Sequence, residues 1–263
     1  MEATINGARI HYEREGSGIP VLLLHAGVAD RRMWEPQVEP FARHFDVIRP
    51  DMRGFGKSEL PPARWSPAAD VLGLIDELRL KPAHVVGCSM GGSAAIDFVL
   101  QNPERVSKLV LVGPGLGGAD FGQKYPELHA EAEEAYKAGD NEAANQAEMR
   151  MWLDGPRRSP GYVRQPLRDL FLDMNGGGFD KDWDSAPLDR LDPPAIDRLH
   201  EISAPTLVVL GDEDMPEIID TVELLMEKIP HARKAVIHDA AHLPNLEHPE
   251  EFNRIVLEFL LSA

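Results

Sequence analysis

The 263-residue sequence has little cysteine, little basic charge and no long apolar run. Its single cysteine, Cys88, excludes an intramolecular disulfide and a multi-cysteine metal site, which favours a reducing compartment. Lys and Arg total 27 against 44 Asp and Glu, and the net charge of −17 argues against nucleic acid or an anionic membrane surface as a partner. Residues 1–4 lack the basic and apolar regions of a signal peptide, and the apolar stretches stay far below the ~20 residues of a membrane helix. We therefore expect a soluble, cytoplasmic globular protein.

Short apolar runs alternate with segments of helical spacing through most of the chain. The runs are too short for helices, and they lie at residues 21–24, 47–48, 84–86, 109–112, 207–210 and 235–237. Strands that are apolar on both faces belong to a sheet that helices cover on both sides. Apolar residues at three- and four-residue steps predict helices around residues 71–78, 95–99, 218–229 and 252–260. The alternation predicts an α/β fold with a doubly wound, mostly parallel sheet.

The alternation stops between Gly113 and Ser203. This interval has helix-forming segments at residues 127–138 and 142–153, and several prolines and a run of three glycines then interrupt it. A helical insertion in an otherwise regular α/β chain is the simplest account. We therefore divide the chain into a core of residues 1–115 and 202–263 and a helical cap of residues 116–201.

The sharpest motif follows the apolar run that ends at Val86. Gly87-Cys88-Ser89-Met90-Gly91 fits G-x-S-x-G between a strand and a helix, the setting of a nucleophilic serine on a strained turn. Residues two before and two after such a serine crowd together, so glycine at both positions removes the Cβ atoms that would collide. Cys88 cannot take the same role, because Val86 and Met90 would flank it. We predict that Ser89 is a nucleophile and that Cys88 is a buried packing residue.

A serine hydroxyl becomes a useful nucleophile only when a base removes its proton. Among ten histidines, His242 stands between the last apolar run and the final helical segment. Acidic residues crowd the end of the preceding run at Asp212, Glu213 and Asp214. Side chains just past the carboxyl ends of strands are where open α/β sheets build their sites. The order serine, acid, histidine is that of a hydrolase triad, with three adjacent acids as candidates.

From about Gly7 to Leu261 the chain resembles the α/β-hydrolase superfamily. The resemblance rests on several stretches: His25-Ala26-Gly27 with Trp34 beyond it, residues 51–58, the Ser89 motif, residues 211–214, and His242-Leu243-Pro244 followed by Glu247 and Pro249. It implies an eight-stranded sheet with the cap inserted after the sixth strand.

The same resemblance assigns roles to single residues. The acid of such proteins usually stands three residues after the strand-end glycine, which implies a triad of Ser89, Asp214 and His242, with Asp212 or Glu213 as the alternative acid. It also implies an oxyanion hole from the backbone N–H groups of Met90 and Gly27. His25 is expected to orient the loop that carries Gly27.

Three other patterns suggest sites that the surrounding residues argue against. Residues 51–58 approach a phosphate-binding loop, but Asp51 occupies the position of the first glycine, and two prolines at 61–62 disfavour the helix that would hold the phosphates. Residues 113–118 satisfy G-x-G-x-x-G, yet no second strand is expected close behind them. Residues 238–242 have the spacing of a zinc-binding helix but follow a strand. No metal and no cofactor are therefore expected.

The expected chemistry is acyl transfer to water, and the leading hypothesis is a carboxylesterase that acts on small, mainly apolar esters. The same triad also serves enol-lactone hydrolysis, C–C bond hydrolysis of a diketone-type substrate, or perhydrolysis. A ligand-binding receptor that retains the triad is the alternative from another class. The expected partners are a small ester or lactone and water, and the sequence leaves the oligomeric state open, a homo-oligomer included.

Substrate choice is expected to lie with the cap. For each apolar cap residue that we predict to line a pocket, packing within the cap's own core is the alternative. These residues are Met151, Trp152, Leu153, Phe171, Met174, Phe179 and Trp183. Four arginines of the cap either bind a substrate carboxylate or lie on exposed helix faces: Arg157, Arg158, Arg164 and Arg168.

Overall fold

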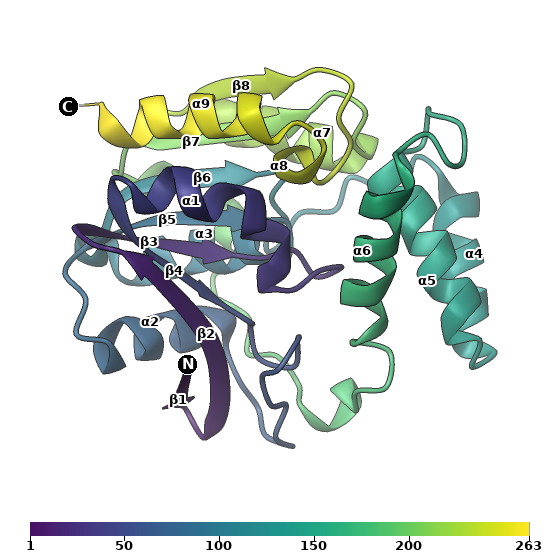
Figure 1. Ribbon diagram of the computed structural model, residues 1–263, viewed down its shortest axis with the longest axis horizontal. Helices are drawn as coiled ribbons and strands as arrows, with labels where there is room; N and C mark the ends of the chain where they lie inside the picture. The colour runs from purple at the N-terminus through teal and green to yellow at the C-terminus, as the bar shows by residue number, and fades with distance from the viewer. Residues whose placement is uncertain (263) are drawn as a thin grey trace.

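The structure is a computed structural model that describes residues 1–262. Within that range the strands form one eight-stranded sheet in the order β1-β2-β4-β3-β5-β6-β7-β8 (Figure 1). Neighbouring strands run parallel from β4 to β8, whereas β1–β2 and β2–β4 pair antiparallel at one edge. The strands are β1 (Glu2–Ile5), β2 (Ala8–Gly16), β3 (Ile19–Leu24), β4 (Phe45–Pro50), β5 (Ala83–Cys88), β6 (Val106–Val112), β7 (Thr206–Gly211) and β8 (Arg233–Ile237). The predicted fold class is confirmed.

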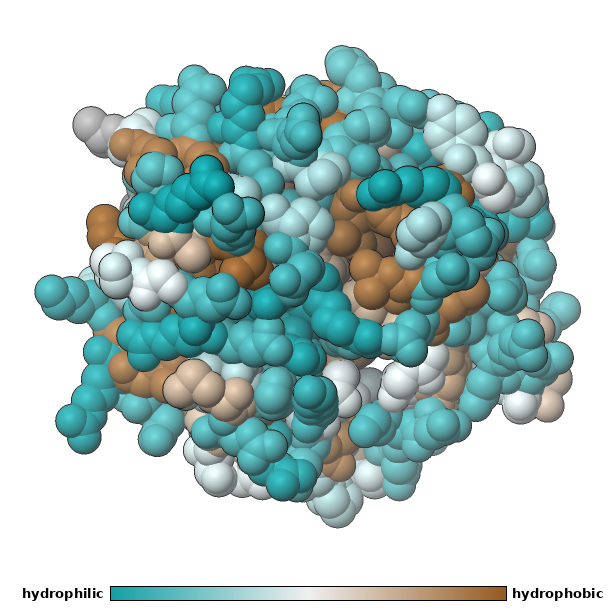
Figure 2. Space-filling view, viewed as in Figure 1, coloured by the Kyte–Doolittle hydropathy of each residue, from teal (hydrophilic) through white to brown (hydrophobic). Residues whose placement is uncertain are grey.

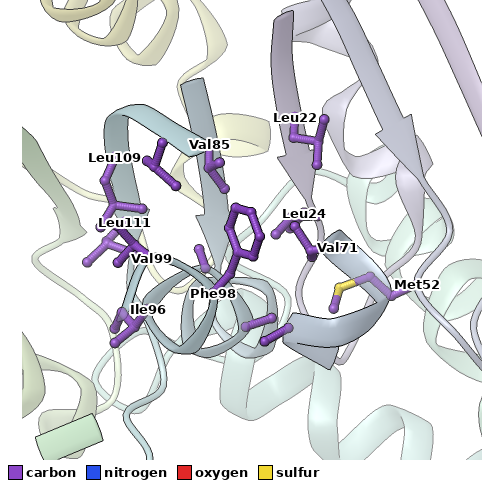
Figure 3. Packing of buried hydrophobic residues seen from close by; sticks show 14 of the residues in the cluster. Leu22, Leu24, Met52, Val71, Val85, Ile96, Phe98, Val99, Leu109 and Leu111 are labelled. Atoms are coloured by element: carbon purple, nitrogen blue, oxygen red, sulfur yellow. The ribbon is translucent and has the colours of Figure 1, made fainter. Parts of the chain in front are cut away.

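Two layers of helices cover the sheet. Alternate residues of a central strand face opposite sides, so that Leu22 and Leu24 of β3 belong to one apolar cluster and Val21 and Leu23 to the other. The first cluster includes α2 (Pro67–Glu77), α3 (Met90–Gln101) and α7 (Pro216–Lys228), and Figure 3 shows Phe98 of α3 packed beneath the strands. The second cluster includes α1 (Glu35–Ala42) and α9 (Pro249–Leu261). Burial on both faces explains why the strands are continuous apolar runs.

The chain leaves the sheet after β6 and returns at β7, and the segment between them stands at the carboxyl ends of the parallel strands (Figure 1). It contains α4 (Pro126–Lys137), α5 (Asn141–Met149), the π-helical turn η3 (Arg150–Asp154) and α6 (Gln165–Gly176). The sequence predicts a single helix over residues 142–153, but the α-helix ends at Met149 and a π-helical turn continues it. We call residues 116–201 the cap. Its position above the strand ends places it over the edge where the predicted triad lies.

Short elements make the remaining connections: η1 (Arg31–Trp34), η2 (Pro103–Arg105), η4 (Trp183–Ser185), η5 (Ala195–Asp197), η6 (Leu199–Glu201) and α8 (Pro244–Glu247). In Figure 2 most of the visible surface is hydrophilic, and apolar residues gather toward the region where the cap meets the sheet. Across residues 1–262 there is no helix with both the length and the apolar character needed to cross a membrane.

Candidate active site

Ser89 occupies a sharp turn between β5 and α3. Its backbone has φ 52° and ψ −114°, a conformation that costs energy for a residue with a side chain and that persists at functional sites. The glycines around it allow the turn to form: a Cβ on Gly87 would lie 2.3 Å from the carbonyl oxygen of Gly91, and one on Gly91 would lie 2.4 Å from that of Leu24. Ser89 itself is half-buried. The crowding predicted from the motif therefore exists in the fold.

His242 and Asp214 form a buried pair beside this turn. The Nδ1 atom of His242 lies 2.9 Å from Oδ2 of Asp214 and 3.1 Å from Oδ1, and both side chains are about 1% exposed. Oδ1 of Asp214 also accepts the N–H of Met215 at 2.7 Å, which fixes the carboxylate against the start of α7. Asp214 follows β7 and His242 follows β8, so that the fold brings together two residues 28 positions apart.

The other two acids of the cluster have different partners. Asp212 accepts hydrogen bonds from the backbone N–H of Asp239 and pairs with His238, whose side chain is 82% exposed. Glu213 pairs with Arg157 of the cap at 2.9 Å. Of the three, Asp214 contacts His242, the partner that the resemblance implies.

Trp152 lies against the imidazole of His242, and Cys88 lies against its backbone. The ring of Trp152 lies 4.6 Å from that of His242, and the backbone carbonyl of Trp152 accepts the N–H of His242 at 3.2 Å. Cys88 is fully buried, and its Sγ lies 3.8 Å from the carbonyl oxygen of His242. Burial raises the pKa of the Cys88 thiol, and the charge of Asp214 adds to the effect. A thiol in this state is a packing group rather than a nucleophile.

The loop that follows β3 lies against the start of α3. A Cβ on Gly27 would lie 3.6 Å from Cβ of Met90, so the two backbones are adjacent. Met90 is the first residue of α3, where an N–H has no acceptor within its own helix. In the part of the chain that the structure describes, the Gly27 N–H makes no backbone hydrogen bond. This geometry is compatible with both groups facing an oxyanion.

His25 holds this loop in place. Its Nδ1 lies 2.8 Å from the carbonyl oxygen of Ala26, and its Nε2 accepts the backbone N–H of Met52 at 2.8 Å. An Nε2 that accepts a hydrogen bond requires the neutral ring, and burial lowers the pKa of His25 accordingly. The carbonyl of His25 in turn accepts the N–H of Gly91 at 3.1 Å. His25 is thus a structural link between the loop and the serine turn.

A cavity of about 510 Å³ lies between the cap and the sheet edge. Gly27 and Trp152 belong to its wall and connect it with the candidate triad, because the first adjoins Met90 and the ring of the second lies beside that of His242. The lining residues are Gly27, Val28, Phe55, Gln123, His129, Ala132, Glu133, Tyr136, Glu148, Met151, Trp152, Asn175, Gly178, Phe179 and Trp183.

The cavity wall differs in part from the one expected from the sequence. Met151, Trp152 and Trp183 line it, whereas Phe171 and Met174 are buried in the apolar cluster that α6 forms with the sheet side. Both residues lie on the face of α6 that packs inward, which an apolar pattern alone cannot tell from a pocket face. Phe179, which the sequence also predicts, lines it, whereas Leu153 is buried in the same cluster as Phe171. Three ring-bearing residues that the sequence reasoning missed line it as well: Phe55, His129 and Tyr136.

None of the four cap arginines lines this cavity within the described chain. Arg157 pairs with Glu213, Arg158 with Glu247, and Arg168 with Asp154, while Arg164 lies exposed. Arg158 and Arg168 are therefore neither exposed helix residues nor groups free for a substrate carboxylate. They are largely buried ion-pair partners instead.

Residues 1–262 contain no group of three or more His, Cys, Asp or Glu side chains placed to hold a metal ion. In the zinc-like spacing, His238 is exposed and paired with Asp212, whereas His242 is buried beside Asp214. In the phosphate-loop-like segment, the Lys57 N–H donates to Oδ2 of Asp51. The loop is therefore closed by its own carboxylate.

An eight-stranded mostly parallel sheet, a serine on a strained strand-to-helix turn, and a buried acid–histidine pair at the same edge together define the α/β-hydrolase class. The Alpha/beta hydrolase family matches this chain over residues 21–255. The chain belongs to that family, and its relatives support hydrolase activity.

The chain is similar to three proteins of known name. The 2-hydroxy-6-oxo-6-phenylhexa-2,4-dienoate hydrolase of Burkholderia cepacia is 30% identical over 286 aligned residues, covering 100% of this chain and 94% of that protein. The enol-lactonase from Burkholderia xenovorans LB400 superimposes with a TM-score of 0.80 at 26% identity, covering 100% of both chains. The esterase EaEST from Exiguobacterium antarcticum superimposes with a TM-score of 0.81 at 25% identity, covering 98% of both.

Proposed function

We propose that this protein hydrolyses carboxylic esters of small, uncharged and mainly apolar substrates through an acyl-enzyme on Ser89. The observation that carries the proposal is the buried Asp214–His242 pair beside a serine on a strained turn. Nε2 of His242, the ring nitrogen that Asp214 does not engage, takes the proton of the Ser89 hydroxyl as Oγ attacks the ester carbonyl. Asp214 holds the ring and stabilises its cation. The N–H groups of Met90 and Gly27 receive the oxyanion.

The second half of the reaction returns the enzyme to its starting state. The protonated imidazole of His242 gives its proton to the leaving alcohol, and the acyl group remains on Ser89. A water molecule, deprotonated by His242, then attacks the acyl carbonyl and releases the acid. No group beyond the three side chains and the two backbone donors is required.

The wall of the cavity supports an uncharged substrate. Its aromatic and apolar members, such as Phe55, Tyr136 and Trp183, offer area to an apolar acyl or alcohol group. The acids Glu133 and Glu148 line it, but within residues 1–262 no lysine or arginine does so. An anionic substrate would therefore lack a counter-charge there.

C–C bond hydrolysis is a second candidate, because a relative 30% identical over the whole chain is named for a dienoate substrate. The same triad performs that reaction on a ketone in place of an ester. A dienoate carries a carboxylate, however, and the acidic wall weighs against binding it. The likeness to an enol-lactonase and an esterase supports the ester or lactone reaction.

Steady-state hydrolysis of p-nitrophenyl esters from acetate to octanoate tests the proposal. Wild type is expected to turn the esters over, and Ser89→Ala is expected to lower kcat by ~10⁴-fold or more. Ser93→Ala, one turn further along α3, serves as the matched control and should retain most of the activity. Equal rates for Ser89→Ala and wild type would contradict the assignment of the nucleophile. Turnover of 2-hydroxy-6-oxo-6-phenylhexa-2,4-dienoate, with none of the esters, would instead favour the C–C reaction.

A further inference from the structure

Two polar side chains of the cap lie next to each other in the wall of the cavity. Glu148 comes from α5 and Asn175 from α6. The amide nitrogen of Asn175 donates to Oε2 of Glu148 at 2.6 Å and to Oδ1 of Asn145 at 2.9 Å. The amide nitrogen of Asn145 donates to the carbonyl oxygen of Leu172 at 2.8 Å. The donors of both amides are thus used within the cap.

The acceptors of this network remain available on the cavity side. Asn175 is 7% exposed, yet its Oδ1 accepts no hydrogen bond from the described residues, and neither does Oε1 of Glu148. Neither oxygen is fully enclosed by protein, because both residues line the cavity, so water can reach each oxygen and a donor on a bound molecule can replace that water. Burial raises the pKa of Glu148, and the hydrogen bond from Asn175 only partly offsets this, so the carboxylate is incompletely solvated.

A purely structural role does not account for both oxygens. The link from Leu172 through Asn145 to Asn175 already joins α5 to α6, and Glu148 adds a charge to it that no basic residue balances. The other acid and the histidine of the wall have partners, since Glu133 pairs with Lys137 at 2.5 Å and His129 pairs with Glu217 at 2.8 Å. Glu148 and Asn175 therefore stand out as unused acceptors in the wall.

We propose that Glu148 and Asn175 form an acceptor subsite that binds a hydroxyl or amide N–H carried by the substrate away from the scissile carbonyl, and that rejects a carboxylate at the same place. The inference rests on the proposed function for the identity of the scissile group. The subsite makes Glu148 a specificity-determining residue, because a donor gains a hydrogen bond to the carboxylate whereas an anion meets a like charge.

The test compares methyl esters that differ only at the far end of the chain. Methyl hexanoate, methyl 6-hydroxyhexanoate and monomethyl adipate present a methyl, a hydroxyl and a carboxylate, and the butanoate and octanoate counterparts cover other distances. Binding to Ser89→Ala is followed through the fluorescence of Trp152 and Trp183, which line the cavity. Because that variant lacks the nucleophile, binding is measured whether or not the wild type hydrolyses these esters. Turnover by wild type is measured separately.

At the best chain length, the hydroxyl ester is expected to bind at least about tenfold more tightly than the methyl ester, the contribution of one hydrogen bond to a charged acceptor. The carboxylate ester is expected to bind about tenfold more weakly than the methyl ester because of the like charge of Glu148. Adding Glu148→Gln to Ser89→Ala removes the charge and turns a donor toward the cavity. The carboxylate ester should then bind at least as tightly as the methyl ester.

Two further variants separate charge from position. Glu148→Asp keeps the charge on a shorter side chain and should retain the rejection of the carboxylate while losing the preference for the hydroxyl. Glu142→Gln makes the same change as Glu148→Gln at an exposed position of α5 away from the cavity and should leave all ratios as they are. Unchanged ratios in Glu148→Gln, or no binding of any ester, would overturn the subsite. Binding with the expected ratios but without turnover would contradict the proposed ester hydrolysis alone.

Discussion

The sheet edge that carries the candidate triad and the cap that covers it are stabilised in different ways. At the sheet edge, Asp214 and His242 are about 1% exposed, and Asp214 follows β7, whose residues are all buried. The cap shares an apolar cluster with the sheet domain and adds charged pairs across the contact, among them Arg158–Glu247, Arg157–Glu213 and Arg32–Asp173. The first region is positioned by backbone and apolar packing, and the second by apolar packing together with individual ion pairs.

This difference separates the chemistry from the choice of substrate. A buried pair on rigid strand ends keeps its geometry when the rest of the molecule changes, which suits residues that exchange protons. A cap joined through separate side chains can change its cavity wall without disturbing the sheet. We therefore expect the residues at the sheet edge to determine the type of reaction and the cap to determine the range of substrates.

The largest expected effect is a change in kcat, and it concerns the acids that follow β7. Asp214→Asn should lower kcat by ~10⁴-fold with little loss of stability, because the amide leaves His242 in the wrong tautomer. Asp212→Asn is the matched control and should keep kcat close to wild type, since Asp212 contacts exposed His238. Ester hydrolysis by both variants decides the assignment. A large loss in Asp212→Asn alone would transfer the role of the acid to that residue.

A second prediction separates the packing of the cap from its cavity wall. Phe171→Ala should lower the free energy of unfolding by ~3–5 kcal/mol, because the ring is fully buried in the apolar cluster. Phe179→Ala, at a half-buried residue of the cavity wall, should cost only about 1 kcal/mol and raise KM for the longer esters. Urea unfolding and chain-length profiles of both variants measure the contrast. The reverse pattern would place Phe171 in the substrate pocket.

A third prediction tests an ion pair between the two regions. The side chains of Arg158 and Glu247 are 6% and 5% exposed, and Oε1 of Glu247 accepts the N–H of Ala241 beside His242. Burial raises the pKa of Glu247 to about 7, and Arg158 acts against that shift. Arg158→Met leaves the carboxyl without its partner and should cost ~3 kcal/mol of stability, measured by urea unfolding.

The control for this prediction is Arg164→Met, which changes an exposed arginine of the same cap segment and should stay within about 0.5 kcal/mol of wild type. An equal effect of the two substitutions would show that the pair with Glu247 contributes nothing specific.

The smallest expected effect is a change in the pH dependence of stability, and it concerns His84 in β5. Burial and the nearby Lys108 lower its pKa from 6.5 to about 4. The unfolded chain then binds more protons than the folded one between these values, so the contribution of His84 to stability is complete above about pH 6.5 and is lost as pH falls toward about 4. His84→Leu should reduce this loss. Thermal unfolding of wild type and His84→Leu at several pH values between about 4 and 6.5 measures the difference. The same change of Tm with pH in both proteins would contradict the prediction.

Much of the fold follows from local patterns in the sequence. Continuous apolar runs predicted buried parallel strands because both faces of each strand lie under helices, and the loss of that pattern after Gly113 predicted where the cap begins. The glycines around Ser89 predicted a crowded turn, and the short distances between Gly87, Gly91 and their neighbours are the physical reason.

The wall of the cavity could not be predicted in the same way. Phe171 and Phe179 are equally apolar in the sequence, and both are predicted to line the pocket. Phe171 packs from α6 into a core, whereas Phe179, beyond the end of α6, lines the cavity. Trp152, whose ring lies 4.6 Å from that of His242, belongs to the π-helical turn after Met149, and no residue pattern predicts that turn.

The sequence by itself determined the class of fold, the strained turn at Ser89, and the presence of an acid and a histidine at successive strand ends. The spacing of hydrophobic residues and of glycines is a local property of the chain, which is why these features could be predicted. Tertiary structure alone decided which acid contacts His242, which arginines form ion pairs, and which polar groups of the cap line the cavity. Those outcomes depend on contacts between residues far apart in the chain. Local sequence patterns do not show which of these residues come close together in space.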